Sequence, residues 1–148
     1  MKALSAHTCT CNKCELKSKN KILIAKGAKT EYRIINENER LIDKYIVDDC
    51  LLKAKQKDEK CDYLVLINEI KEAYFVECKG SDVLKAVNQL DSSINILRNN
   101  LPGYVLKGRI ISTRVYSPDL RMQAYKRLRE KLKGQLETRN IVFIELIK

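Results

Sequence analysis

Two acidic residues and a lysine lie at the ends of a predicted β-hairpin. Residues 61–80 form two apolar runs separated by the polar segment 68–71, a pattern typical of antiparallel strands joined by a short turn. With that turn, Asp62 lies opposite Glu77, and directly opposed residues have Cβ atoms about 4.5–5.5 Å apart. Side chains alternate along a strand, so Lys79 points to the same face as Glu77.

Metal-assisted hydrolysis is the chemistry that this group of side chains predicts. Two carboxylates so close together repel each other unless a cation lies between them. Magnesium prefers carboxylate oxygens and often takes only one or two of them, with water in its other positions. A neighbouring lysine can hold a phosphate or a metal-bound water. Together these groups suit the hydrolysis of a phosphodiester.

The pattern Asp62, then Glu77-x-Lys79, between apolar strands and before an amphipathic helix, resembles the PD-(D/E)xK nuclease superfamily. The resemblance covers residues 45–97 well and the rest of the chain to 148 more loosely, and it is closest to small stand-alone members. Cys61 stands where this superfamily often has proline. The resemblance implies a restriction-endonuclease-like fold with an αβββαβ core.

The resemblance also implies roles for five residues. Asp62 and Glu77 would hold one or two magnesium ions, or manganese, and the backbone carbonyl of Cys78 would be a further ligand. Lys79 would position the attacking hydroxide and stabilise the charge that develops on the phosphate. Gln89, on the following helix, would complete the site, although an ordinary polar position explains it equally well.

Further ligands stay open in the sequence. Asp48 lies on a predicted strand that could neighbour the hairpin, where it would either add a ligand or form a turn. An N-terminal helix glutamate is common in this superfamily, and the sequence does not choose among Glu15, Glu31, Glu37 and Glu39.

Charge favours a nucleic acid as the partner. The 148-residue chain has 29 Lys and Arg against 19 Asp and Glu, a net charge of +10. Neutralising phosphates with release of counterions drives nucleic-acid binding that is independent of sequence. No apolar stretch is long enough to span a bilayer, and the N-terminus has no secretory signal, so we expect a cytoplasmic protein with no membrane partner.

An N-terminal cluster of cysteines is a candidate structural metal site. Cys9, Cys11 and Cys14 lie together, with His7 just upstream. Four ligands within eight residues would be cramped, so Cys50 or Cys61 could supply the fourth ligand of a zinc site. An iron–sulfur cluster is an option by resemblance, since some nucleases of the superfamily carry one. A segment with reduced thiols is the alternative, and the other cysteines are expected to be buried.

The remaining elements predict one α/β (α+β) domain over 21–148, preceded by a cysteine-bearing arm over 1–20. Its central mixed sheet would be flanked by helices on its faces. Strands are expected at 31–36 and 40–52, paired with each other, then at 109–116 and 141–147. The segment 21–27 is either a short strand or the tail of a helix, and the charged segment 53–60 is expected to be a solvated loop.

Two helices are expected after the hairpin. The first is capped at Ser81 or Asp82 and buries a stripe at spacings of three and four: Val83, Val87, Leu90, Ile94 and Leu97. The second runs from 117 to about 133. Its other side is basic, and it is either an ordinary solvated face or a contact for a phosphate backbone through Arg121, Lys126, Arg129 and Lys133.

Three functions follow from the sequence. A Mg²⁺-dependent DNA endonuclease is favoured. A ribonuclease with the same site is the first alternative, since phosphates are common to both nucleic acids. A non-catalytic nucleic-acid-binding or assembly module is the second. Cleavage of both strands of a duplex would suit a homodimer, and small nucleases of this kind also act as subunits of larger complexes.

Overall fold

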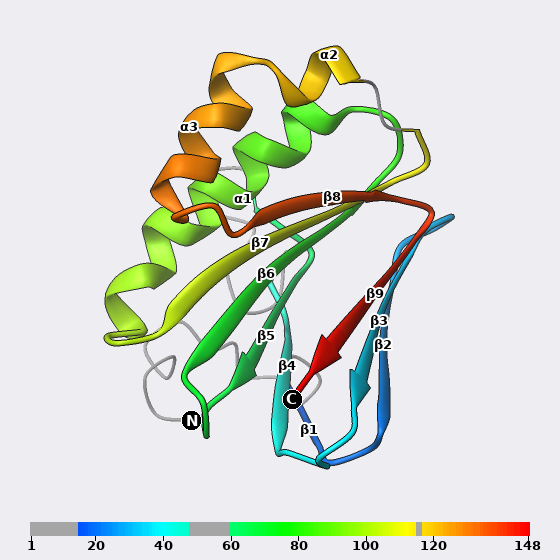
Figure 1. Cartoon of the computed structure of the whole chain (residues 1–148), viewed down its shortest axis with the longest axis vertical. Helices are drawn as coiled ribbons and strands as arrows, with labels where there is room; N and C mark the ends of the chain where they lie inside the picture. The colour runs from blue at the N-terminus through cyan, green and yellow to red at the C-terminus, as the bar shows by residue number, and fades with distance from the viewer. Residues whose placement is uncertain (1–14, 48–59, 115–116) are drawn as a thin grey trace.

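A six-stranded mixed sheet forms the middle layer of the protein (Figure 1). The computed structural model describes residues 15–47, 60–114 and 117–148. The order of strands across this main sheet is β1 (Glu15–Ser18), β4 (Ile42–Ile46), β5 (Tyr63–Ile67), β6 (Glu72–Lys79), β7 (Val105–Ser112) and β8 (Leu136–Asn140). The pairs from β1 to β6 are antiparallel, whereas β6, β7 and β8 run parallel.

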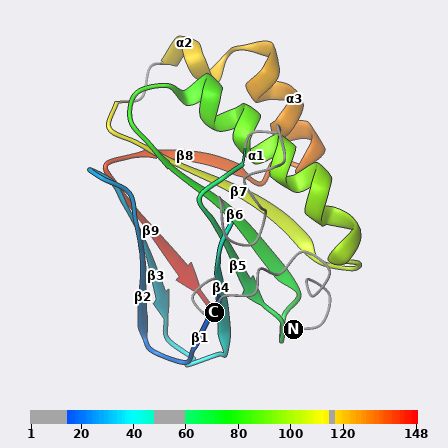
Figure 2. The same cartoon turned by 180° about the vertical axis from the view of Figure 1, so that it is seen from behind.

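Different layers cover the two faces of the main sheet, as Figure 2 shows from behind. One face carries the helices α1 (Val83–Leu97), α2 (Ser117–Leu120) and α3 (Gln123–Lys131) and the short 3₁₀ segment Arg98–Asn100. The other face carries a second, three-stranded sheet in the order β2 (Ile22–Lys26), β3 (Glu31–Asn36), β9 (Val142–Ile147). In the described ranges, no helix has the length and apolar character needed to span a membrane.

Alternation along the hairpin strands divides the core in two. Leu64 and Phe75 belong to the apolar cluster against the helices, whereas Val65 and Val76 belong to the cluster against the second sheet. Each strand of the hairpin is therefore apolar on both faces, as its continuous apolar sequence requires. Between the two sheets lies a buried ion pair, Arg109 with Glu145, to which the Tyr32 hydroxyl also donates a hydrogen bond of 2.8 Å.

The predicted hairpin and its register are confirmed. Leu64 pairs with Phe75 and Leu66 pairs with Ala73, in the register that a 68–71 turn imposes. The turn is fixed by Asn68, whose side chain donates to Asp43 at 2.9 Å and accepts from the Tyr104 hydroxyl.

Helix α1 is also confirmed. The Asp82 carboxylate accepts a hydrogen bond of 2.9 Å from the Lys85 amide, which caps the first turn. All the residues of the predicted stripe are buried against the main sheet.

The predicted pairing of 31–36 with 40–52 is wrong. Strand β3 pairs with β2 and β9, whereas β4 pairs with β1 and β5 in the main sheet. Between them the buried Asn36 side chain donates to the carbonyls of Asn20 and Arg40 and accepts from the Arg40 amide. These bonds make the segment a corner that carries the chain from one sheet to the other, not a hairpin turn.

The C-terminal third also differs from the sequence prediction. The helix expected over 117–133 is two helices, because the backbone at Met122 is extended and begins a new helix there. Strand β8 was not predicted. After it, Ile141 has a φ of 64°, a conformation that is rare for a β-branched residue, and the chain turns from the main sheet into β9 of the second sheet.

The prediction of a sheet flanked by helices is only partly right. In the part of the chain that the structure describes, helices cover one face and strands cover the other, and strands rather than a helix precede the hairpin. Residues 15–18 of the segment expected to be an arm form β1, which pairs with β4 at the edge of the main sheet.

Candidate active site

The carboxyl ends of the three parallel strands meet at one edge of the main sheet, at the upper right of Figure 1. The Thr113 amide donates to the Gly80 carbonyl at 2.8 Å, which ties the segments that follow β6 and β7. In the amide orientation that satisfies both of its side-chain atoms, Asn140 donates to the carbonyls of Ser112 (3.1 Å) and Thr113 (2.9 Å). In open sheets, ligands bind at such carboxyl ends.

Asp62 and Glu77 lie side by side at this edge, joined through the backbone. The Asp62 amide donates to Glu77 Oε1 at 3.0 Å, and the Cys78 amide donates to Asp62 Oδ2 at 2.9 Å. The Asp62 amide also contacts the Val76 carbonyl at 3.1 Å. Each carboxylate therefore accepts a hydrogen bond from the strand that carries the other, and the two are held together as the hairpin predicted.

The two acids differ in exposure. Glu77 is 1% exposed, whereas Asp62 is half-buried. Alternation places Glu77 on the helix face with Phe75, which belongs to the cluster against α1. A buried carboxylate is costly unless it is hydrogen-bonded or paired with a cation, and the Asp62 amide supplies such a hydrogen bond to Glu77.

The two cysteines next to the acids, Cys61 and Cys78, have raised pKa values. Burial raises the pKa of Cys61, and the carboxylates of Glu77 and Asp62 raise it further. Burial raises the pKa of Cys78 to about 12, with the Asp62 carboxylate as the next largest cause. The raised pKa values of Cys61 and Cys78 favour the protonated thiols near neutral pH. Cys78 points away from the acids, as predicted, with its sulfur 3.9 Å from the Ala25 carbonyl.

The donor chemistry of the pair fits a hard divalent cation. Magnesium commonly binds through one or two carboxylates and keeps several waters, which Asp62 and Glu77 can provide for. Over residues 15–47, 60–114 and 117–148, no group of three or more Asp, Glu, His or Cys side chains is placed to hold a metal. The site therefore suits a partly hydrated ion, not a closed protein cage.

The structure describes the other predicted metal ligands only in part. The Cys78 carbonyl packs against Gly27, where an added Cβ would be 3.2 Å from its oxygen. Asp48 lies outside the described residues; Val47, just before it, donates to the Asp62 carbonyl at 2.9 Å. The four candidates of the N-terminal metal site also lie outside them: His7, Cys9, Cys11 and Cys14.

The predicted lysine ends strand β6. Lys79 pairs with Ser112 through the backbone, and its side chain lies outside the described part of the structure. Sequence reasoning missed a second lysine: Lys60, expected in a solvated loop, is only 6% exposed and lies two residues before Asp62. A lysine next to an apolar cysteine, at the end of a charged run, was the available signal.

Helix α1 contacts the segment that carries Asp62. The Gln89 side-chain nitrogen donates to the Lys60 carbonyl at 3.2 Å, and its oxygen is buried with no hydrogen-bond partner among the described residues. One turn later, Ser93 accepts from the Cys61 amide at 2.8 Å. Gln89 thus contacts residues 60–62, which lead into β5 and are here called the strand entry, and its predicted part in the site stays a prediction. Ser93 is a positioning residue that the sequence did not reveal.

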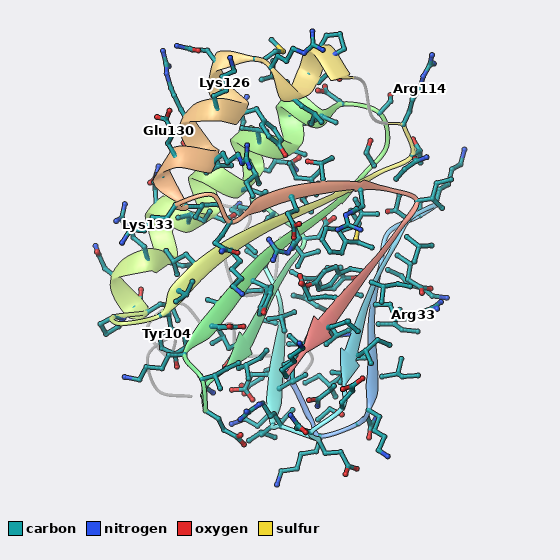
Figure 3. All side chains as sticks on the ribbon, viewed as in Figure 1. Arg33, Tyr104, Arg114, Lys126, Glu130 and Lys133 are labelled. Atoms are coloured by element: carbon teal, nitrogen blue, oxygen red, sulfur yellow. The ribbon has the colours of Figure 1, made fainter. Side chains whose placement is uncertain are left out.

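Exposed basic residues lie in two separate parts of the fold. The exposed Lys26 and Lys29 flank the turn between β2 and β3, whose Gly27 packs on Cys78, and Arg114 follows the end of β7. The predicted basic helix residues are exposed on α3 and the turns beside it: Arg121, Lys126, Arg129 and Lys133. Figure 3 shows Lys126 and Lys133 on the opposite side of the helix layer from Arg114.

The glutamates considered as helix ligands are not on helices. Glu15 is in β1, Glu31 is in β3, and Glu37 and Glu39 lie in the corner after β3.

Comparison of the chain with known protein families, with curated proteins and with solved structures found no match.

Proposed function

We propose that the protein is a metal-dependent nuclease of the PD-(D/E)xK type that hydrolyses phosphodiester bonds, with DNA as the favoured substrate. The observation that carries the proposal is the pairing of Asp62 with Glu77 through reciprocal backbone hydrogen bonds at the end of a hairpin. Two carboxylates held side by side in a partly buried place are suited to bind a divalent cation.

The order of elements around the pair supports the same proposal. Strands β4, β5 and β6 form an antiparallel meander, helix α1 crosses over, and β7 returns parallel to β6. This order agrees with the βββαβ part of the core that the resemblance implies, with Asp62 before the second of these strands and Glu77 near the end of the third. The second sheet occupies the face where that core would have its other helix.

In this proposal, Asp62 and Glu77 hold magnesium or manganese, together with the Cys78 carbonyl. The bound ion would polarise the phosphate and lower the pKa of a bound water. Lys79 positions the nucleophile and stabilises the developing negative charge. Gln89 holds the backbone before Asp62 through its bond to the Lys60 carbonyl. Its buried side-chain oxygen has no hydrogen-bond partner among the described residues and would accept a hydrogen bond from a water held in the site.

Charge supports a nucleic-acid substrate. The chain carries a net charge of +10, and its exposed cations Lys26, Lys29 and Arg114 lie at the same edge as the acid pair. Phosphates flanking the scissile bond would contact this rim. The basic side of α3 would then be a secondary contact for a longer substrate. The ribonuclease alternative uses the same groups, because both nucleic acids present the same phosphates.

The non-catalytic alternative also rests on an observation. Both carboxylates accept backbone hydrogen bonds, and Glu77 is almost fully buried, so the pair could serve only to close the end of the hairpin. In that case the basic surface would bind nucleic acid without cutting it, alone or within a larger complex.

Cleavage of a mixed panel tests the proposal. The panel contains duplex, single-stranded, branched and supercoiled DNA and RNA, each with magnesium, with manganese and with EDTA. We expect metal-dependent cutting that is lost in Asp62→Asn, Glu77→Gln and Lys79→Ala. The matched control is Asp91→Asn, which makes the same carboxylate-to-amide change on α1, where the Asp91 side chain is 45% exposed and pairs with Lys131.

Metal binding gives a readout that does not depend on finding the substrate. Titration calorimetry with Mg²⁺ should show binding to the wild type and to Asp91→Asn, and binding weakened at least tenfold in Asp62→Asn, about 1.4 kcal/mol. A wild type that cuts nothing, binds no Mg²⁺ and binds nucleic acid as well as Asp62→Asn does would refute the nuclease proposal in favour of the binding module.

A further inference from the structure

The outer face of the second sheet is an exposed apolar surface. Of the two faces of this sheet, the inner one packs on the main sheet through residues such as Tyr32, Ile34 and Phe143. The outer one alternates with it and presents six aliphatic side chains, here called the outer patch: Ile22, Ile24, Ile35, Val142, Ile144 and Leu146. Ile144 and Leu146 are 52% and 60% exposed.

The outer patch is continuous across all three strands. Cross-strand register places Ile22, Ile35 and Leu146 in one row and Ile24, Arg33 and Ile144 in the next. Three neighbouring strands therefore contribute to one surface of roughly 500 Å² of apolar area, which is at the upper end of what monomers expose. Scattered single apolar residues would need no explanation, but a contiguous sheet face does.

An ion pair lies in the centre of this surface. Arg33 and Glu31 are neighbours on the outer side of β3, and the Arg33 guanidinium contacts the Glu31 carboxylate at 2.6 Å. Figure 3 shows Arg33 projecting from the second sheet away from the main sheet. A two-fold axis between these two residues would place each Arg33 against the Glu31 of the other copy, as a self-complementary interface requires.

We propose that the outer patch binds the outer patch of a second copy of this chain, forming a two-fold dimer by sheet-on-sheet packing. Two sheets pack face to face through interdigitating aliphatic side chains, which the rows of the patch supply. With Glu31 and Arg33, the face offers roughly 650 Å² on each partner, which lies at the lower end of stable interfaces.

The chemistry of the face favours a second copy over other occupants. Its centre is apolar with one internally neutral ion pair, whereas the chain as a whole carries +10. Nucleic acid is therefore a poor occupant, because phosphates bind to cations and not to aliphatic side chains. A largely aliphatic face whose central Arg33 is paired within the face suits a protein–protein interface, where arginine is enriched and other charged residues are depleted. This dimer does not depend on the proposed nuclease activity.

Sedimentation equilibrium of the full chain, from about 1 µM to about 100 µM, tests the proposal. We expect twice the chain mass of 17.1 kDa at the upper concentrations. Ile144→Lys places two like charges in the packed centre, which should weaken dimerisation by at least about 100-fold. Leu146→Lys is a second variant with the same expectation. Both side chains are more than half exposed, so the monomer should fold, and circular dichroism melting checks this.

Two controls make the surface specific. Val105→Lys changes an equally exposed aliphatic residue, 50% exposed, at the start of β7 in the main sheet, and should leave the dimer intact. Arg33→Glu should weaken the dimer, and the swapped pair Glu31→Arg with Arg33→Glu should restore it. A wild-type monomer at about 100 µM would overturn the proposal. A dimer that survives Ile144→Lys and Leu146→Lys, or that Val105→Lys disrupts equally, would overturn it as well.

Discussion

Replacing Ser93 with alanine should loosen the segment that carries Asp62. The Ser93 hydroxyl accepts a 2.8 Å hydrogen bond from the Cys61 amide, and both residues are fully buried. Alanine would leave this amide without its acceptor, because water cannot reach it. An unsatisfied buried donor costs about 1–3 kcal/mol. Alanine recovers about 0.5 kcal/mol through its higher helix propensity.

The net destabilisation is therefore about 0.5–2.5 kcal/mol, which for a chain of this size lowers Tm by about 2–8 °C. Urea unfolding and thermal melting measure it. The matched control is Ser92→Ala, the same change one position earlier on α1, where the half-buried Ser92 is outside the core. This control should be neutral or slightly stabilising.

The same substitution has a functional consequence. Asp62 follows Cys61 directly, and its amide must stay in place to donate to Glu77 at 3.0 Å. If the proposed site is correct, Ser93→Ala should weaken Mg²⁺ binding by a few-fold more than Ser92→Ala does. Equal stabilities of the two variants would refute the claim that α1 holds the strand entry through this bond. Unequal stabilities with equal Mg²⁺ affinities would confine Ser93 to a structural role.

Three further predictions concern the layers around the site. Arg109→Met removes the guanidinium that pairs with the Glu145 carboxylate in a buried setting, so the free energy of unfolding in urea should fall by about 3–5 kcal/mol. Adding Glu145→Gln should recover at least half of that loss. Gly27→Ala places a Cβ 2.7 Å from the Cys78 Cβ and should lower the free energy of unfolding by about 1–3 kcal/mol. Its control is Gly80→Ala, where an added Cβ meets nothing within 4 Å, and the loss in the same assay should be less than about 1 kcal/mol. The raised pKa of Cys78, about 12, should make its alkylation at pH 8 on the order of 1,000-fold slower in the folded protein than in urea. Since the folded pKa of Cys78 lies above the unfolded one, the stability that its protonated thiol contributes is present below about pH 9 and is lost as the pH rises toward 12.

The burial and hydrogen bonds of Asp62 and Glu77 bear on both proposed functions. Glu77 is nearly inaccessible, and the hydrogen bonds that join it to Asp62 would hold the hairpin end closed without any metal. In the proposed function the pair binds a divalent cation, and a ligand that binds the folded state stabilises it. We therefore expect that Mg²⁺ raises the thermal stability of the wild type but not that of Asp62→Asn.

The elements that sequence predicted correctly are those fixed by near neighbours. The 68–71 turn sets the hairpin register, because a one-residue slip would move every side chain to the opposite face. Helix α1 follows from an aspartate cap and an apolar stripe within 16 residues, Asp82 to Leu97. The neighbouring positions of Asp62 and Glu77 follow from the same hairpin, so the centre of the candidate site could be inferred from residues 61–80 alone.

Strand partners distant in sequence could not be inferred in this way. Strand β3 has the alternation of any half-buried strand. Nothing in that pattern says that it pairs with the preceding β2 rather than with β4, or that its second partner is β9, more than a hundred residues later in the chain. The corner at Asn36 depends on carbonyls of Asn20 and Arg40, which only the folded chain brings together. The turn at Ile141 likewise depends on the close approach of β3, whose Glu31 amide donates to the Ile141 carbonyl.

The sequence by itself therefore determined the hairpin, the crossover helix and the acid pair, because each is encoded by residues close together along the chain. Tertiary structure alone decided that a second sheet, not a helix, covers the other face, and that this sheet has an apolar outer side. It also decided that Lys60 is buried and that Ser93 holds the strand entry. These features depend on which distant surfaces pack together, and periodicity records only that a residue is buried, not what buries it.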